Sequence, residues 1–306
     1  MLKKIVFMGT PEFAVPSLEV LNDSNYEISA VYSQPASKAN RGQKLAESKI
    51  EILAKKFSLN IRTPKILDSD VEYNFLKSIQ PDIVIVAAYG KIIPKRFLSI
   101  PKYGFVNVHA SLLPKWRGAA PIQRSIMNRD KESGISIMKI NENLDEGPVC
   151  NQYSLKISEK MNAEELSEKL SLIASEKILD ILDNVFDDNL EFKDQDHSKA
   201  TYAKKIQKLE GKIDWNENVD KIIGKINGLY PYPGAFFSFN GERYKILKAE
   251  KSSTTGKPGD IVSENFEVCC GEGSIKVLSI QREGKRVQQI NEFLLGTQIK
   301  KGFNIA

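Results

Sequence analysis

The chain of 306 residues has few of the residue types that bind metals or form cross-links, since it contains 3 cysteines and 2 histidines. Cys150 stands alone, Cys269 and Cys270 are neighbours, and no group of Cys and His residues has the spacing of a metal site. The cysteines therefore form no disulfide framework. We expect a protein of the reducing cytoplasm whose functional site holds no metal.

Long apolar runs are also missing. The strand-like run at 82–88 is far shorter than the roughly 20 residues of a membrane-spanning helix. The apolar run at the N-terminus is cut at Gly9 and Pro11, which predicts a first strand and not a signal peptide. With 41% hydrophobic and 27% charged residues, the composition is that of a soluble globular protein of one large or two ordinary domains.

A dinucleotide-binding turn is absent as well. That turn needs three glycines, for a tight bend, for close approach of the pyrophosphate and for helix packing. After the first predicted strand this chain has one glycine, Gly9, within residues 8–13. These residues by themselves indicate an ordinary turn from a strand into a helix.

Charge is spread unevenly along the chain. Residues 201–306 hold 17 Lys and Arg against 12 Asp and Glu, whereas the first 200 residues hold 27 of each. The whole net charge of +5 therefore lies in the last third. Such a mild excess is explained either by a solvated surface or by a weak electrostatic footprint for a polyanion such as RNA.

The first half of the chain alternates strand and helix patterns. Continuous apolar strands between amphipathic helices predict an α/β fold, a Rossmann-like, mostly parallel sheet with flanking helices. Such sheets bind ligands at the carboxyl ends of their strands. The predicted strands are 4–8, 28–32, 82–87, 104–109, 134–140 and 149–157, and the predicted helices are 12–21, 44–57, 69–78 and 163–185.

The pattern changes after the long helix. A polar, unpatterned stretch predicts a linker, and short strands with turns between them predict a small, OB-like β-barrel. These strands are 235–239, 244–249, 260–263, 267–270 and 274–281, preceded by a helix at 219–227. We therefore predict an α/β domain at 1–189, a linker at 190–206 and a C-terminal barrel domain at 207–306.

Asn107 and His109 form the most informative pair in the chain. They stand two apart in a strand pattern, so both side chains point to one face, and Ser111, Pro114 and Gly118 then force an irregular loop. An amide and an imidazole at the end of a strand indicate a catalytic pair, to which a turn at Asp145 could add a carboxylate. The alternative is a buried histidine bonded to a backbone carbonyl.

A serine hydrolase is a further alternative, because Ser111, His109 and Asp145 supply its three residue types. However, no Gly-x-Ser-x-Gly elbow surrounds Ser111. Ser111 also lies on the loop beside His109 and not on a sharp turn facing it. The sequence therefore does not favour this chemistry.

Residues 34–44 form a polar connection that is longer than the usual two to six residues. It carries Lys38, Arg41 and Lys44 and no acidic residue. A solvated loop is one interpretation. The other is a loop that grips a phosphate backbone near the ligand-binding edge of the sheet.

Several long motifs together resemble the folate-dependent formyltransferases, and among them those that act on Met-tRNA. The resemblance covers essentially the whole chain, and its central motif is highly specific. The motifs are Phe-Met-Gly-Thr-Pro-Glu-Phe-Ala-Val-Pro-Ser-Leu at 7–18, Arg-Gly-Gln-Lys at 41–44, Ala-Tyr-Gly-Lys-Ile-Ile-Pro at 88–94, Asn-Val-His-Ala-Ser-Leu-Leu-Pro-Lys-Trp-Arg-Gly-Ala-Ala-Pro-Ile at 107–122, Leu-Asp-Glu-Gly at 144–147, Pro-Gly-Asp-Ile at 258–261 and Phe-Leu-Leu-Gly at 293–296.

The resemblance implies transfer of a formyl group from 10-formyltetrahydrofolate to the free α-amino group of methionine on initiator Met-tRNA. It implies direct attack through a tetrahedral intermediate, without a metal, in a cytoplasmic monomer. The residues it implies are Asn107, His109 and Asp145 for catalysis, Ser111, Leu112, Leu113 and Pro114 for the folate, and Lys38, Arg41 and Lys44 for the tRNA.

Two segments depart from the family pattern. Asn143-Leu144-Asp145-Glu146-Gly147 stands where the family usually has Gly-Leu-Asp-Thr-Gly, so the aspartate is kept in an altered setting. Residues 229–234 replace the usual Asn-Pro-x-Pro-Gly. Two other functions stay open: a formyltransferase for sugar nucleotides or other small amines, and a non-catalytic RNA-binding protein on the same fold.

Overall fold

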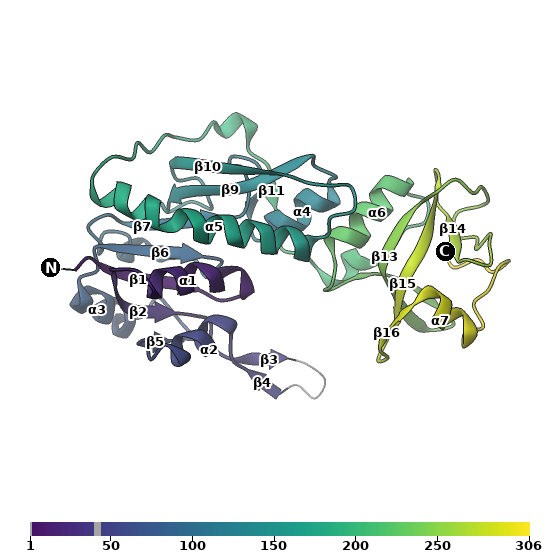
Figure 1. Ribbon diagram of the computed structural model, residues 1–306, viewed down its shortest axis with the longest axis horizontal. Helices are drawn as coiled ribbons and strands as arrows, with labels where there is room; N and C mark the ends of the chain where they lie inside the picture. The colour runs from purple at the N-terminus through teal and green to yellow at the C-terminus, as the bar shows by residue number, and fades with distance from the viewer. Residues whose placement is uncertain (1, 40–43) are drawn as a thin grey trace. The chain divides into compact units, whose positions relative to one another are not determined.

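The computed structural model describes residues 2–39 and 44–306 (Figure 1). Contacts within the chain divide it into two compact units. The first consists of residues 1–119, 134–155 and 167–203, and the second of residues 120–133, 156–166 and 204–306.

A seven-stranded sheet forms the centre of the first unit, in the order β10-β9-β7-β6-β1-β2-β5. Neighbours from β5 to β7 are parallel, whereas β7 and β9 are antiparallel. The prediction of a mostly parallel α/β sheet is therefore confirmed. The strands are β1 (Lys4–Gly9), β2 (Glu27–Tyr32), β5 (Ile61–Arg62), β6 (Ile83–Ala87), β7 (Phe105–His109), β9 (Glu132–Lys139) and β10 (Val149–Lys156).

Helices cover both faces of this sheet. Helices α1 (Val15–Asn22) and α5 (Ala163–Phe186) lie beside one another over one face (Figure 1), and Ser171 of α5 donates to the carbonyl of Phe13 just before α1. On the other face, Leu76 of α3 (Asp70–Ile79) packs against Val6 and Met8 of β1. Side chains of alternate residues of β1 thus serve two cores, which is why this strand is apolar throughout.

Polar side chains cap the starts of α3 and α5. The Ser69 hydroxyl accepts from the amide of Glu72 at the start of α3, and Asn162 accepts from the amide of Glu165 at the start of α5. The prediction of a helix from residue 44 is wrong. The chain first forms a hairpin of β3 (Ser37–Ala39) and β4 (Lys44–Ala46), and α2 (Lys49–Lys56) begins only after the cap Ser48.

An antiparallel sheet forms the centre of the second unit, in the order β12-β13-β15-β14, with β16 paired to β15. Large apolar side chains fill its core, among them Trp215 and Phe237. The expected strand at 260–263 is reduced to isolated bridges. The strands are β12 (Ala235–Phe239), β13 (Glu242–Ser252), β14 (Glu267–Cys269), β15 (Ser274–Arg282) and β16 (Val287–Gln289).

Helices of the second unit pack closely through glycines. In α6 (Val219–Gly228), a side chain at Gly224 or Gly228 would collide with Met127 of α4 (Pro121–Met127). Short elements complete the fold: α7 (Ile290–Leu295), the 3₁₀ turns η1 (Glu12–Ala14), η2 (Lys95–Phe97), η3 (His197–Lys199) and η4 (Lys208–Gly211), and the paired short strands β8 (Arg117–Gly118) and β11 (Tyr202–Ala203). Within the described ranges, every helix is too short or too polar to cross a membrane.

Candidate active site

Strand β7 delivers Asn107 and His109 to the carboxyl edge of the sheet, between β6 and β9. Asn107 is half-buried, and its side-chain amide has no hydrogen-bond partner within residues 2–39 and 44–306. His109 is buried, with 6% of its surface exposed. The strand thus presents one open amide beside one enclosed imidazole.

The two nitrogens of His109 have different surroundings. Nε2 lies 3.0 Å from the carbonyl oxygen of Trp116, and because a carbonyl only accepts, Nε2 carries the proton. Nδ1 faces Oδ2 of Asp145 at 3.6 Å. His109 therefore combines the features of both interpretations, a buried ring on a backbone carbonyl and an imidazole facing a carboxylate.

Asp145 lies in the connection between β9 and β10, 36 residues after His109 in the chain. Its backbone has a left-handed φ of 52°, which Asp tolerates better than most residues. Oδ2 accepts a hydrogen bond of 2.8 Å from the amide of Gly118. Oδ1 has no such partner in the part of the chain that the structure describes.

Glycine is required at two positions for the chain to come close to Asp145. Gly118 has a φ of +114°, and a Cβ there would lie 2.9 Å from the carbonyl oxygen of Ala203. A Cβ on Gly147 would collide with the carbonyl oxygen of Lys139. Glycine at these two positions lets the chain close around Asp145.

The loop after β7 is held by its own polar groups and by the neighbouring strands. The Ser111 hydroxyl donates to the carbonyl of Lys115 at 2.6 Å, and Ser136 of β9 accepts from the amide of Leu113 at 2.9 Å. Gln152 of β10 donates to the carbonyl of Leu113 at 2.8 Å. Ser111 and Leu113 are buried, whereas Leu112 and Pro114 are half-buried, so the loop is ordered and these two residues face outward more.

Sequence reasoning missed several residues behind the site. Arg117 is 1% exposed and bonds to Gln195 and Glu146, and Gln195 in turn bonds to the backbone at Asp145. Arg117 lies within the long central motif, which was a usable signal. Gln195 lies in the stretch predicted as a linker, where no local pattern marks it.

The cysteines are not suited to act as nucleophiles. Burial raises the pKa of the Cys150 thiol to about 11 and that of the Cys270 thiol to about 12, and it raises the pKa of Cys269 as well. All three are therefore neutral thiols near pH 7. Nowhere in the described residues do three or more His, Cys, Asp or Glu side chains gather as metal ligands would.

The basic loop is described only in part. Lys38 lies in β3 and Lys44 in β4, and the two strands pair with Ala39 opposite Lys44. Arg41 lies outside the described residues. The structure therefore establishes the base of a hairpin at this loop.

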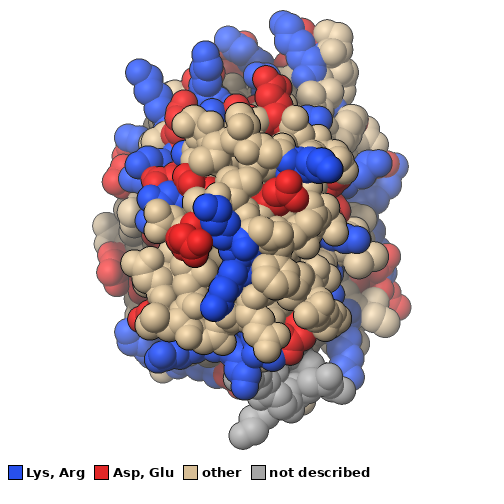
Figure 2. Space-filling view, turned by 90° about the vertical axis from the view of Figure 1, so that its right-hand side faces the viewer, with Lys and Arg blue, Asp and Glu red and all other residues tan. Residues whose placement is uncertain are grey.

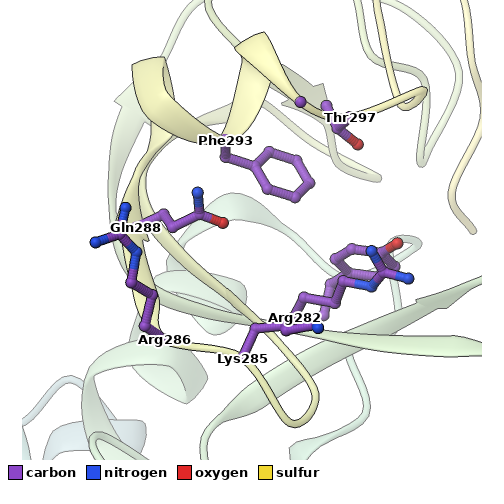
Figure 3. A pocket seen from close by; sticks show the side chains of 8 residues that line it. Arg282, Lys285, Arg286, Gln288, Phe293 and Thr297 are labelled. Carbon is purple, nitrogen blue, oxygen red and sulfur yellow. The ribbon is translucent and has the colours of Figure 1, made fainter.

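A pocket of about 290 Å³ lies in the second unit, beside β15, β16 and α7. Arg282 and Lys285 lie along one side, Arg286 and Gln288 along another, and the ring of Phe293 lies above them (Figure 3). Arg282 is paired with Glu242, and hydrogen bonds from Arg282 and Tyr244 lower the pKa of the Glu242 carboxyl. Lys285 and Arg286 also line the pocket, and both carry a positive charge.

The chain matches two protein-family models. Residues 3–182 match the formyl transferase model, and residues 205–298 match the model of the formyl transferase C-terminal domain. A methionyl-tRNA formyltransferase of Pelagibacter ubique is 59% identical over 307 residues, which cover 100% of this chain and 99% of that protein.

Solved structures share the fold at lower identity. HypX from Aquifex aeolicus, in complex with tetrahydrofolic acid, has a TM-score of 0.68 at 15% identity over 98% of this chain, which spans 48% of the HypX chain. An N-formyltransferase from Helicobacter canadensis, in complex with folinic acid and dTDP-3-aminofucose, also has a TM-score of 0.68, at 19% identity. The match covers 94% of this chain and 99% of the Helicobacter canadensis protein.

Glu146 is expected to contribute to stability through its ion pair with the buried Arg117, whose Nη1 lies 3.0 Å from Oε1 of Glu146. Replacing Glu146 by Gln keeps the shape but leaves the guanidinium with neutral partners. We expect the free energy of unfolding to fall by about 1–3 kcal/mol. Urea denaturation would measure this, with Glu191→Gln as an exposed control paired to the exposed Lys193. Equal stability of the two variants would contradict the prediction.

Proposed function

The chain belongs to the methionyl-tRNA formyltransferase family, and from this premise we propose which of its residues carry out formyl transfer to Met-tRNA. The formyl donor of the family is 10-formyltetrahydrofolate, and the acceptor in our proposal is the free α-amino group of methionine on the initiator tRNA. The observation that carries the proposal is that Asn107 and His109 share one face of β7 and that Oδ2 of Asp145 lies 3.6 Å from Nδ1 of His109. The experiment that tests it is a transfer assay with the purified protein, in which charged initiator tRNA competes with free methionine and sugar amines.

Asn107 is the group that stabilises the developing oxyanion. As the amine attacks the formyl carbon, negative charge grows on the formyl oxygen. The open amide of Asn107 donates to that oxygen, an effect worth roughly 3–4 kcal/mol in comparable sites. The intermediate is tetrahedral, and no covalent bond to the protein forms.

His109 and Asp145 manage the protons. Because Nε2 of His109 is bonded to Trp116, the nitrogen left for proton exchange is Nδ1, which faces Asp145. Asp145 takes the proton that the attacking amine loses and passes it to Nδ1 of His109, and in the imidazolium that forms, Oδ2 of Asp145 orients the ring. His109 then gives this proton to the folate nitrogen from which the formyl group departs, so that the protein ends in its starting protonation state.

The loop from Ser111 to Pro114 forms part of the folate pocket in this proposal. Its hydrogen bonds fix the backbone, and Leu112 and Pro114 are the side chains with surface left for contact. Ser111 contributes by holding the loop, since its hydroxyl is engaged with Lys115. A preformed apolar wall of this kind suits the flat ring of a folate.

The assignment of tRNA binding rests on charge. We assign catalysis to residues 1–189, a linker to 190–206, and an OB-like barrel that binds tRNA to 207–306. Figure 2 shows Lys and Arg side chains across one face of the molecule, with Asp and Glu side chains interspersed among them. The pocket with Lys285 and Arg286 offers the phosphate backbone a local positive site beside an aromatic ring. We further propose a monomer that acts in the cytoplasm, where charged tRNA is used.

Single replacement of Asn107, His109 or Asp145 by Ala should lower kcat by roughly 10² or more, since each removes a transition-state donor or an acid–base group. The Kd for folate should change little. Steady-state kinetics and folate titration measure the two quantities, and circular dichroism checks folding. A folded variant with nearly normal kcat would remove that residue from the mechanism.

Affinity for tRNA should depend strongly on salt because the positive charge of residues 201–306 displaces counterions from the RNA. Replacing both Lys285 and Arg286 by Ala should reduce the slope of log Kd against log salt by about 1–2. The control Lys257→Ala removes an exposed cation of the same unit that does not line the pocket. If the Kd of the wild-type protein for tRNA does not change with salt concentration, the electrostatic role of the second unit is wrong. This unit then acts as a spacer or recognises the shape of the tRNA.

Arg41 should matter for the acceptor end of the tRNA. An arginine fork bonds phosphate or base edges bidentately and stacks on an unpaired base. Arg41→Ala should therefore raise KM for tRNA and lower kcat, with folate binding intact. Arg41→Lys should restore only part of the loss. If Arg41→Ala is as efficient as wild type on charged initiator tRNA, the loop is ordinary solvated surface.

A further inference from the structure

Gln195 connects the predicted linker to the turn that carries Asp145. Its Nε2 donates to the carbonyl of Asp145 at 2.8 Å and to the carbonyl of Gly147 at 2.7 Å. The side chain is buried, with 8% of the residue exposed. One amide group therefore bridges the two carbonyls on either side of Glu146.

The amide of Gln195 can take only one orientation. Its Oε1 accepts from Nε and Nη2 of Arg117 at 3.1 and 2.9 Å, and a guanidinium has only donors. Its NH₂ group faces two carbonyls, which have only acceptors. A flipped amide would place oxygen against oxygen and nitrogen against nitrogen, so the orientation is fixed by both neighbours.

Arg117 anchors this amide. The guanidinium is almost fully buried and is held by Glu146 at 3.0 Å, by Gln195, and by Nδ1 of His197 at 3.3 Å. A buried, multiply bonded guanidinium moves little, because any displacement breaks several bonds to a charged group. Gln195 therefore links the turn that carries Asp145 to this rigidly held guanidinium.

The same two segments also hold His109. The carbonyl of Trp116 accepts from His109, and the amide of Trp116 donates to Oγ1 of Thr201 at 2.9 Å. The amide of Gly118, next to Arg117, donates to Oδ2 of Asp145. Both partners of the His109–Asp145 pair are thus fixed from one side by residues 116–118, which residues 195–203 support.

We propose that Gln195 is a positioning residue for formyl transfer, which keeps Oδ2 of Asp145 within reach of Nδ1 of His109. This inference rests on the proposed catalytic role of Asp145. Gln195 itself touches no substrate. Its effect is exerted on the Asp145 backbone, which in its left-handed conformation needs support from its surroundings.

The decisive variant is Gln195→Glu. It keeps the length and the acceptors for Arg117, but it replaces the two donors by an oxygen that repels the carbonyls of Asp145 and Gly147. We expect kcat for formyl transfer to fall about 10- to 100-fold, as displacement of a reacting group by about 1 Å commonly causes. KM for folate and for Met-tRNA should stay within about twofold, because the binding surfaces are unchanged.

Two further variants separate positioning from charge. Gln195→Met removes the same donors without adding a charge, and it should show the same loss of kcat. Gln80→Glu adds the same charge at an exposed position that precedes β6, at the amino edge of the sheet, and should leave kcat unchanged. Melting curves of each variant report whether the protein is folded. If Gln195→Glu does not fold, the kcat of Gln195→Met alone tests the proposal.

A double-mutant cycle distinguishes positioning from general structural support. If Gln195 acts through Asp145, Gln195→Glu should cost less than about twofold in kcat in an Asp145→Ala background. A full, additive loss in that background, or a normal kcat in the single variants, would overturn the proposal. The Asp145→Ala protein itself tests the proposed function separately, since normal activity there would remove Asp145 from the mechanism whatever Gln195 does.

Discussion

The return of the chain after β7 is the constraint on which the candidate site depends. The loop that leaves the sheet at His109 folds back so that the Trp116 carbonyl meets the imidazole and the Gly118 amide meets the Asp145 carboxylate. Without that return, Asn107 and His109 would stand alone at a strand end. Glycine at 118 is required because a Cβ there would crowd the neighbouring Ala203 carbonyl. The geometry of the candidate site thus depends on the backbone conformation of the loop that follows β7.

A buried positive charge stabilises this arrangement. Arg117 is the largest polar group enclosed near the site, and its bonds to Glu146 and Gln195 compensate its removal from water. Glu146 is, with Asn143, one of the two residues by which this segment departs from the usual Gly-Leu-Asp-Thr-Gly motif. Its pairing with Arg117 gives this departure a physical role, since the carboxylate neutralises a buried guanidinium. The aspartate next to it keeps its contact with His109.

Charged groups in the two units act over different distances. Inside the first unit, a few charges at about 3 Å fix side-chain geometry with little screening. On the second unit, the cations that we propose to attract tRNA would act through solvent, where salt weakens their attraction. This division suits a transferase for a tRNA substrate, in which loose attraction captures a large partner and a rigid site performs the reaction.

The sequence by itself determined the identity of most elements and the positions of the candidate catalytic pair. Apolar runs specified β1, β6 and β7, Ser69 and Asn162 marked the starts of two helices, and the two-residue spacing placed Asn107 and His109 on one face. These features are local, because periodicity and caps act within a few residues. The tertiary structure alone decided which nitrogen of His109 faces Asp145, where the helix after the basic loop begins, and that Gln195 of the predicted linker supports the Asp145 turn. The contacts of His109 and of the Asp145 turn depend on segments 36 and 86 residues after His109, and no local pattern encodes which hydrogen bonds such distant segments make. The start of α2 depends instead on the pairing of β3 with β4 and on the cap Ser48.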